Sequence, residues 1–252
     1  MTIAILSALP EEQGGLAAAL AAPRESVHGG RQFHSGTLHG QPVVLALSGI
    51  GKVAAAITAT LLIERFGARQ LVFTGVAGGL GDEVRVGDVV VAEHMLQHDM
   101  DASPIFPRWE LPGTGRTLLD CDSVLSTLIL RAARACLPGA TDQNDHETTP
   151  GLQIHHGLIV SGDRFVSTAA ESDALRAGLR AAGYNPLAVE MEGAAVAQVC
   201  GDYGVPCAIV RTISDRADDA AHRDFTRFVR EVASRYSDRL IHALLRAFTD
   251  LR

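Results

Sequence analysis

Short apolar runs alternate with longer stretches of helical periodicity along the whole chain, and this alternation constrains the fold most. The apolar, β-branched runs predict strands at residues 2–8, 70–74, 88–98, 154–161, 187–189 and 206–213, with a hairpin at 32–38 and 42–47. The helical periodicity predicts helices at residues 11–22, 53–66, 120–136, 169–182, 192–203 and 225–248. The alternation predicts an α/β fold of three layers, with a central mixed, mostly parallel sheet flanked by helices.

The length and continuity of the chain favour one domain. The 252 residues contain no repeat, no low-complexity tract and no clear linker, so residues 1–252 are expected to form a single domain. Residues 99–119 are rich in proline and glycine and predict a long loop, and the polar residues 138–150 predict a surface loop.

Charge and cysteine content exclude several classes of partner. The net charge of −7, from 22 basic and 29 acidic residues, argues against binding to nucleic acid or to an anionic membrane. The longest smooth apolar stretch, residues 53–63, is too short to span a bilayer, and the first ten residues do not resemble a signal peptide. Four cysteines without a C-x-x-C pair predict a reduced cytoplasmic protein with buried thiols.

No cofactor or metal ion is expected. The glycine-rich run at residues 75–81 is neither a dinucleotide-binding fingerprint nor a phosphate-binding Walker loop. The pair His155-His156 and the pair His98 and Asp101 lack further partners at the spacing that metal ligands use.

Ligands of α/β sheets bind beyond the carboxyl ends of the strands, so the residues that follow each strand are the first candidates for a site. Glu11 and Glu12 follow the first strand, where they are either functional or first-turn residues that favour the helix dipole. The glycines of residues 75–81 either admit a ligand to the backbone or form a tight turn. Phe165, in the turn 161–165, either stacks on a planar base or packs in the core.

Two later segments place charged residues inside apolar runs. In residues 189–197, Glu190 and Glu192 lie among apolar neighbours. A buried carboxylate needs an ion-pair partner or a functional role, so we favour a functional role for this segment over a purely structural one. The strand at residues 206–213 leads into Asp215, and strand alternation places Arg211 and Asp215 on one side. Asp215 is alternatively a cap for the next helix.

The combined set suits glycosidic hydrolysis. Such a reaction uses one carboxyl group as the acid toward the leaving group and another as the base toward water. Glu12, Glu192, Asp215 and Arg211 supply those groups, and the remaining charge stabilises a cationic ribosyl centre.

Five motifs carry a resemblance to a known family. They are Ser-Gly-Ile-Gly-Lys at 48–52, Thr-Gly-Val-Ala-Gly-Gly at 74–79, Val-Ser-Gly-Asp at 160–163, Val-Glu-Met-Glu-Gly at 189–193 and Arg-Thr-Ile-Ser-Asp at 211–215. In this order and spacing the chain resembles the bacterial 5′-methylthioadenosine/S-adenosylhomocysteine nucleosidases of the purine nucleoside phosphorylase superfamily. The resemblance covers nearly the whole chain.

The resemblance implies catalytic roles. Glu12 is expected to be the general base that activates water, and Asp215 the acid that protonates or hydrogen-bonds N7 of adenine. Glu192 is expected to bind the ribose hydroxyls, with Met191 against the sugar. Arg211 is expected to help hold the water and Glu12.

The resemblance also implies a binding pocket. Phe165 is expected to stack on adenine, the backbone of Val166 to read its edge, and Ser214 to support Asp215. Ile50 and Phe225 are expected to line the apolar end that receives the methylthio group. The expected substrate-binding set further includes Val76, Ala77, Gly78 and Glu190.

Family resemblance further implies a homodimer, in which a loop of a neighbouring subunit closes the pocket. Ala102, Ile105 and Phe106 lie in the matching stretch and are expected near the partner's pocket. Two positions depart from the common pattern, since Leu9 replaces Met and Val76 replaces a Ser that assists the water.

Three alternatives remain open. A phosphorylase of the same fold needs a cationic cradle for phosphate, and the chain has Glu11-Glu12 and Thr74 in the corresponding regions. A nucleosidase for another purine nucleoside, such as futalosine, shares the catalytic residues. A nucleoside-binding module needs neither the acid Asp215 nor the base Glu12.

Overall fold

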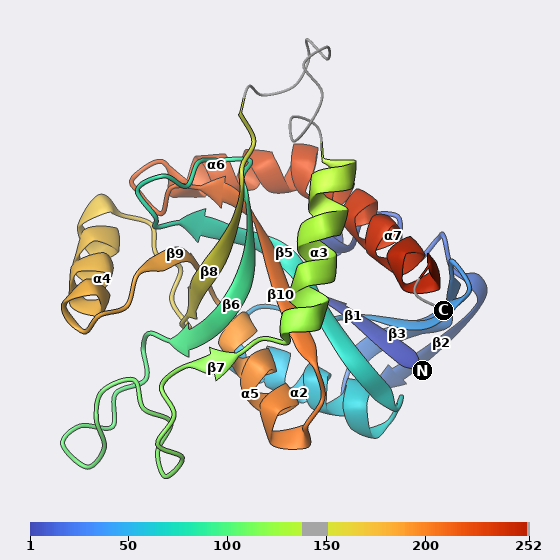
Figure 1. Cartoon of the computed structure of the whole chain (residues 1–252), viewed down its shortest axis with the longest axis horizontal. Coiled ribbons are helices and arrows are strands. Elements are labelled where there is room, and N and C mark those ends of the chain that lie inside the picture. Colours follow the sequence, from blue (N-terminus) through green and yellow to red (C-terminus); the bar gives the residue numbers. More distant parts are fainter. Residues whose placement is uncertain (138–150, 251–252) are drawn as a thin grey trace.

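A mixed sheet forms the centre of the protein, and helices cover both of its faces (Figure 1). The structure is a computed structural model that describes residues 1–137 and 151–250. The expected loop at 138–150 therefore lies outside the described residues. Among residues 1–137 and 151–250, none of the helices combines the length and the hydropathy that a membrane span requires.

The strands occupy most of the expected positions. They are β1 (Thr2–Ser7), β2 (Ala21–His28), β3 (Arg31–Leu38), β4 (Gln41–Leu47), β5 (Ala68–Gly79), β6 (Val89–Gln97), β7 (Leu119–Asp120), β8 (Ile154–Ser161), β9 (Pro186–Glu190) and β10 (Cys207–Asp215). The helices are α1 (Pro10–Gln13), α2 (Lys52–Glu64), α3 (Ser123–Cys136), α4 (Ala169–Ala181), α5 (Gly193–Tyr203), α6 (Ala221–Phe228) and α7 (Ser234–Asp250). A π-helical turn, Val229–Ala233, joins α6 to α7.

The strand order is β10-β6-β8-β9-β5-β1-β4-β3-β2, and β10 also pairs with β5. The pairs β1–β4, β1–β5, β5–β10, β6–β8 and β8–β9 are parallel. The pairs β2–β3, β3–β4, β5–β9, β6–β7 and β6–β10 are antiparallel. The expected mixed sheet is confirmed, but antiparallel pairing is more frequent than the strand–helix alternation suggests, and β10 closes part of the sheet into a ring.

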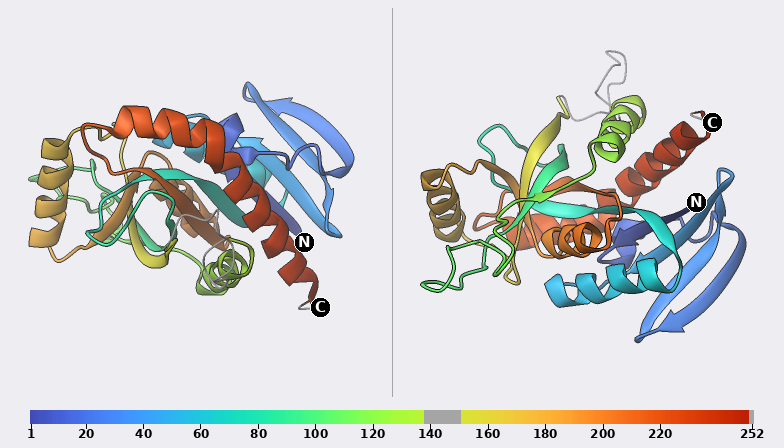
Figure 2. Two further views of the ribbon diagram at one scale, coloured as in Figure 1. Left: turned by 90° about the horizontal axis from the view of Figure 1, so that it is seen from above. Right: turned by 60° about the horizontal axis from the view of Figure 1, so that its bottom comes forward.

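Alternate residues of each central strand supply two hydrophobic cores. In β1, Ala4 and Leu6 pack in the core under α2 and α5, whereas Ile3 and Ile5 pack in the core under α3 and α7. Successive strand side chains point to opposite faces, so an apolar strand of this kind must be covered on both sides. Figure 2 shows α7 lying across one face, with both chain termini on the side of the β2–β3 hairpin.

Two local expectations were wrong, and a third was incomplete. The helix expected at residues 11–22 ends at Gln13, because Gly14 adopts a positive φ of 61°, and the chain then enters β2. The helix expected at 225–248 is present, but it begins earlier, at Ala221, and contains a π-helical turn between α6 and α7. The glycines expected as a loop after a short strand belong to β5, where Gly75 and Gly78 pair with β10.

Candidate active site

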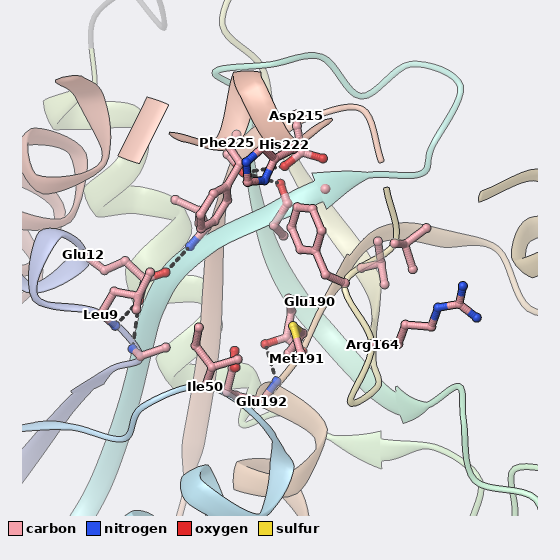
Figure 3. Close-up of a pocket in the computed structure, with 18 of the residues that line it drawn as sticks. Leu9, Glu12, Ile50, Arg164, Glu190, Met191, Glu192, Asp215, His222 and Phe225 are labelled. Atoms are coloured by element: carbon pink, nitrogen blue, oxygen red, sulfur yellow. Dashed lines mark hydrogen bonds between the residues drawn. The ribbon is translucent and has the colours of Figure 1, made fainter. Parts of the chain in front are cut away.

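A cavity of about 360 Å³ lies where the segments after β1, β8, β9 and β10 meet α6 (Figure 3). Its volume is within the range that small-molecule sites usually have. The lining residues are Ala8, Leu9, Glu12, Ile50, Val76, Ala77, Gly78, Arg164, Phe165, Val166, Val189, Glu190, Met191, Glu192, Ser214, Asp215, His222, Phe225 and Thr226.

Glu12 is held at one end of this cavity by three backbone N–H groups. Ala8 and Leu9 each donate to Oε2 at 2.8 Å, and Val76 donates to Oε1 at 3.0 Å. Burial raises the pKa of Glu12, while the charge of Arg211 and the three N–H donors oppose that rise. A fixed carboxyl group with a raised pKa is suited to accept a proton from water.

Gly75 provides the space that the Glu12 carboxylate occupies. A Cβ atom at this position would lie 2.8 Å from Oε1 of Glu12. Gly78 is similarly close to the second carboxyl group, because its Cβ would lie 3.0 Å from Oδ1 of Asp215. Both glycines are therefore required by the close approach of a carboxylate to β5.

Asp215 is buried at the end of β10. Its Oδ2 accepts a hydrogen bond from Ser214 Oγ at 2.8 Å, and its Oδ1 accepts one from the backbone of Ala217 at 2.8 Å. Burial raises the pKa of Asp215, although both hydrogen bonds oppose the rise. The strand register shifts between Ile213 and Asp215, so Asp215 reaches the cavity while Ile213 stays in the core.

Glu192 lies directly before α5 and points to the glycine-rich loop. Its Oε1 accepts a hydrogen bond from the backbone N–H of Gly51 at 2.8 Å. Burial, and secondarily the charge of Glu190, raise the pKa of Glu192 to about 8. Near neutral pH this carboxyl group therefore carries a proton, which allows it both to donate and to accept hydrogen bonds.

Glu190 and Arg211 form a buried ion pair beneath the cavity. Arg211 Nη2 donates to Glu190 Oε2 at 2.7 Å, and Nη1 donates to the carbonyl oxygens of Phe73 and Val210 at 3.1 Å. The backbone N–H of Gly193 donates to both carboxylate oxygens of Glu190, at 3.0 and 2.8 Å. This pair therefore anchors the N-terminus of α5, where a negative charge is favourable.

Ser161 completes this anchor from β8. Its hydroxyl donates to Glu190 Oε1 and accepts from the backbone N–H of Ala194 at 2.7 Å. Because β8, β9, β10 and α5 all contribute to the same network, it fixes the position of Glu192 relative to the sheet.

Aromatic and aliphatic side chains form the rest of the wall. Phe165 and Phe225 meet edge to face, with ring centroids 5.6 Å apart. Ile50 and Leu9 also line the cavity, whereas the side chain of Arg164 extends away from the other labelled residues (Figure 3). The cavity thus offers rings and apolar surface between carboxyl groups, an arrangement suited to a planar base joined to a polar sugar.

A polar cluster joins the glycine-rich loop to the turn that carries Phe165. Lys52 Nζ contacts Asp99 Oδ1 at 2.6 Å, and the backbone N–H of Lys52 donates to Asp163 Oδ1 at 2.7 Å. The backbone N–H of Asp163 donates to Asp99 Oδ2 at 2.8 Å. The loop that contacts Glu192 and the turn that presents Phe165 are thereby held together.

Comparison with known proteins places this chain in a family. A profile of the phosphorylase superfamily matches residues 2–249. The chain belongs to the phosphorylase superfamily. Within that superfamily it is 34% identical over 245 residues to the 5′-methylthioadenosine/S-adenosylhomocysteine nucleosidase of Chromohalobacter salexigens, covering 97% of this chain and 96% of that protein.

Two further members of the superfamily are similar to the chain. The aminodeoxyfutalosine nucleosidase of Helicobacter pylori is 34% identical over 233 residues, which cover 92% of this chain and 93% of that protein. The crystal structure of the Neisseria meningitidis 5′-methylthioadenosine/S-adenosylhomocysteine nucleosidase with methylthio-immucillin-A superposes with a TM-score of 0.86 at 33% identity. That match covers 98% of this chain and 99% of that one.

The catalytic and substrate-binding residues that the superfamily resemblance singled out line the cavity, except for Arg211. Ala102, Ile105 and Phe106, which the resemblance places near a partner's pocket, do not line the cavity of their own chain. Arg211 was expected to hold Glu12, but its guanidinium donates to Glu190 instead. The difference has a geometric cause, since Arg211 shares the face of β10 that carries Ile209 and Ile213 into the core. Its charge still acts on Glu12 by lowering the pKa of that group.

The expected site residues did not include Ala8, Leu9, Arg164, Val189, His222 and Thr226, yet all six line the cavity. Helical spacing indicates two of them, because His222 lies three residues before Phe225 on α6 and Thr226 lies four residues after His222. Within the described residues, no group of three or more His, Cys, Asp or Glu side chains is arranged to hold a metal ion.

Proposed function

We propose that this protein hydrolyses the N-glycosidic bond of 5′-methylthioadenosine and S-adenosylhomocysteine, releasing adenine and the 5-thioribose product. The observation that carries the proposal is the meeting of three buried carboxyl groups, those of Glu12, Glu192 and Asp215, around one largely apolar cavity. The nucleosidase of Chromohalobacter salexigens and the inhibitor-bound nucleosidase of Neisseria meningitidis support the same activity.

The chemistry follows from the position of each carboxyl group. The bond from C1′ to N9 breaks, its electron pair passes into the adenine ring, and Asp215 gives a proton to N7 of that ring. Glu12 takes a proton from water as the water oxygen bonds to C1′. Glu192 binds the ribose hydroxyls, and nearby carboxylate charge stabilises the cationic ribosyl centre.

Hydrolysis is favoured over phosphorolysis by the charge around Glu12. A phosphate nucleophile needs cationic side chains or clustered N–H donors aimed at it. The N–H groups of Ala8, Leu9 and Val76 are already occupied by Glu12. The side chain of Arg164 pairs with Glu171, outside the cavity. A neutral water molecule suits this acidic end of the site better than phosphate.

A nucleosidase for another purine nucleoside is the second candidate, because the relative in Helicobacter pylori is an aminodeoxyfutalosine nucleosidase. The two candidates share the adenine and ribose contacts and differ in the group at the 5′ end. The cavity wall that receives this group includes Ile50 and Phe225, which are apolar and accept either substituent.

We also propose a homodimer in which a partner covers the face of α2 and the loop 102–106. Ile50, Val53 and Ile57 are 57%, 71% and 43% exposed, and Ile105 is 81% exposed. A helix that is apolar on its outer face is usually buried in an assembly. Because Ile50 also lines the cavity, a second copy seated here would narrow the cavity mouth.

A cytoplasmic location remains part of the proposal. The four cysteines, Cys121, Cys136, Cys200 and Cys207, are free thiols, which is the usual state in a reducing compartment.

Adenine release from 5′-methylthioadenosine by the purified protein tests the reaction. We expect rapid release in phosphate-free buffer, with free methylthioribose as the second product, and no acceleration when phosphate is added. Release that requires phosphate, with a ribosyl phosphate as product, would make the protein a phosphorylase. Binding without release under both conditions would support a nucleoside-binding module.

A further inference from the structure

A second hollow, of about 440 Å³, lies along the outer side of α6 next to the cavity. It is lined by His222, Arg223, Thr226, Arg227 and Arg230. His222 and Thr226 also line the first cavity, so the two spaces meet at this helix. Both spaces border the helix that carries Phe225, the residue expected at the 5′ end of the substrate.

Helical geometry explains how the hollow acquires its charge. Arg223, Arg227 and Arg230 are spaced by four and then three residues, which places them on one face of a helix. His222 and Thr226 lie on the edge of this face toward the cavity, beside Phe225. Arg230 falls in the π-helical turn, a feature that is often found at functional sites.

The guanidinium groups here are largely available for a ligand. Arg227 lies 3.5 Å from Asp224, which partly offsets its charge. Arg223 and Arg230 form no ion pair with any residue in the described part of the chain. These arginines give the hollow three guanidinium groups, with the carboxylate of Asp224 beside one of them on the same helix.

Around the rest of the substrate, the polar side chains that line the cavity are mostly carboxyl groups, which give an anion no positive charge to pair with. Glu12, Glu192 and Asp215 surround the expected positions of water, ribose and base. The guanidinium of Arg164 is directed to Glu171. A negatively charged group on the substrate is therefore favoured only where the substrate leaves the cavity beside α6.

We propose that the hollow on α6 is a subsite for a carboxylate carried at the 5′ end of the nucleoside. The proposal rests on the proposed nucleosidase activity and specifies the substrate class of the same site. 5′-Methylthioadenosine has a neutral methyl group there, whereas S-adenosylhomocysteine ends in an amino-acid carboxylate. A futalosine-type nucleoside ends in an aromatic carboxylate, so both have the chemistry that Arg223 and Arg230 recognise.

The subsite makes Arg223 and Arg230 determinants of specificity, with no part in bond cleavage. They act on substrates that extend past Phe225 and leave short, neutral substrates unaffected. Their charge is exposed, so solvent and salt screen the contribution of each group, and the attraction weakens as ionic strength rises.

Three adenine nucleosides separate the carboxylate from other properties of the tail. They are 5′-methylthioadenosine, 5′-butylthioadenosine and 5′-(3-carboxypropylthio)adenosine, and the last two differ mainly in the terminal carboxylate. The test variant is Arg223→Gln/Arg230→Gln. The matched control, Arg24→Gln/Arg65→Gln, removes the same charge at two exposed positions that line neither space.

In the test variant, KM for the carboxypropyl substrate should rise by about five- to tenfold, while KM for the butyl substrate stays within about twofold. The kcat values for all three substrates, and every constant of the control, should remain near those of the original protein. High salt should raise KM of the original protein for the carboxypropyl substrate alone. An equal change for the butyl and carboxypropyl substrates, or no change for either, would overturn the subsite.

Failure of the subsite is distinguishable from failure of the proposed function. If the protein cleaves 5′-methylthioadenosine but does not respond to the carboxylate, the hydrolase stands and the subsite falls. If none of the three nucleosides releases adenine, both proposals fall. If the subsite is supported, kinetics with S-adenosylhomocysteine and with aminodeoxyfutalosine identify which of these nucleosides supplies the carboxylate. The nucleoside that uses the subsite should lose more kcat/KM in the test variant than the other.

Discussion

Buried carboxyl groups dominate the site at the scale of single residues. Glu12, Glu192 and Asp215 each have a raised pKa, with burial as the largest cause. They differ in what surrounds them, because Glu12 accepts three backbone N–H bonds whereas Asp215 accepts one hydroxyl and one N–H. These surroundings support different tasks for chemically similar groups.

The first prediction concerns Asp215 as the acid. Asp215→Asn keeps the side-chain shape and an acceptor oxygen for the Ala217 N–H, but it removes the proton that N7 receives. We expect kcat for 5′-methylthioadenosine to fall by about 10²- to 10⁴-fold with KM little changed, measured by adenine release. Asp219→Asn, at an exposed position nearby, serves as the control. Undiminished kcat in Asp215→Asn would remove Asp215 as the acid.

The second prediction concerns the space that Gly75 leaves. In Gly75→Ala the new methyl group would lie 2.8 Å from Glu12 Oε1, so it must displace the carboxylate. We expect a folded protein whose kcat falls by roughly 100-fold, as it should in Glu12→Gln, because a shift of about 1 Å misaligns the base. Gly178→Ala is the control, since its Cβ meets nothing within 4 Å. Full activity in Gly75→Ala would contradict the assignment of Glu12 as base.

A third prediction follows from the raised pKa of Glu192. In the unfolded chain this group ionises near its ordinary value of 4.5, but in the folded protein it keeps its proton until about pH 8. The folded state therefore binds more protons than the unfolded chain between these pH values. Its free energy of unfolding falls as pH rises through that window, by roughly 1.4 kcal/mol per pH unit. Urea unfolding from pH 5 to 8.5 should show a flatter profile for Glu192→Gln. Identical slopes for the two proteins would refute the shift.

At the scale of elements, the N-terminus of α5 is the part of the site that neighbouring strands position together. Glu190 accepts hydrogen bonds from Ser161, Gly193 and Arg211. The network joins β8, β9 and β10 to the helix that follows Glu192. Each of these segments is predictable on its own, but their convergence depends on the strand order.

The fourth prediction tests this anchor. Glu190→Gln leaves Arg211 buried without a negative partner, which typically costs about 3–5 kcal/mol. The free energy of unfolding should fall by about that amount, and KM should rise because Glu192 loses its support. Glu93→Gln changes an exposed Glu on β6 and should leave both quantities unchanged. A stability of Glu190→Gln equal to that of the control would mean that the ion pair does not anchor α5.

At the scale of the whole molecule, closure of the sheet and the exposed apolar face of α2 shape the entrance to the site. β10 pairs with both β5 and β6, and this double pairing brings Asp215 to within reach of Gly78. The exposed face of α2 adjoins the same cavity through Ile50.

The fifth prediction concerns the homodimer. Val53→Lys places a charge at the centre of the exposed apolar face of α2, where Val53 is 71% exposed. Sedimentation velocity should show a dimer for the original protein and a monomer with raised KM for the variant. Val27→Lys, at a 64% exposed valine on β2, is the control and should stay dimeric. A monomeric original protein would overturn the homodimer.

The local pattern of the sequence determined the α/β class, most strands and the carboxyl groups of the site, because side-chain periodicity and buried charge are local properties. It did not determine that the glycines of residues 75–79 belong to β5, that the sheet closes through β10, or that Arg211 contacts Glu190. Those features depend on which strands become neighbours, and strand pairing is set by contacts between residues far apart in the chain. The single domain expected for residues 1–252 stays a prediction. Only the tertiary structure decided how α6 joins the cavity to the arginine-lined hollow, because the two spaces exist only after the strands and α6 have packed.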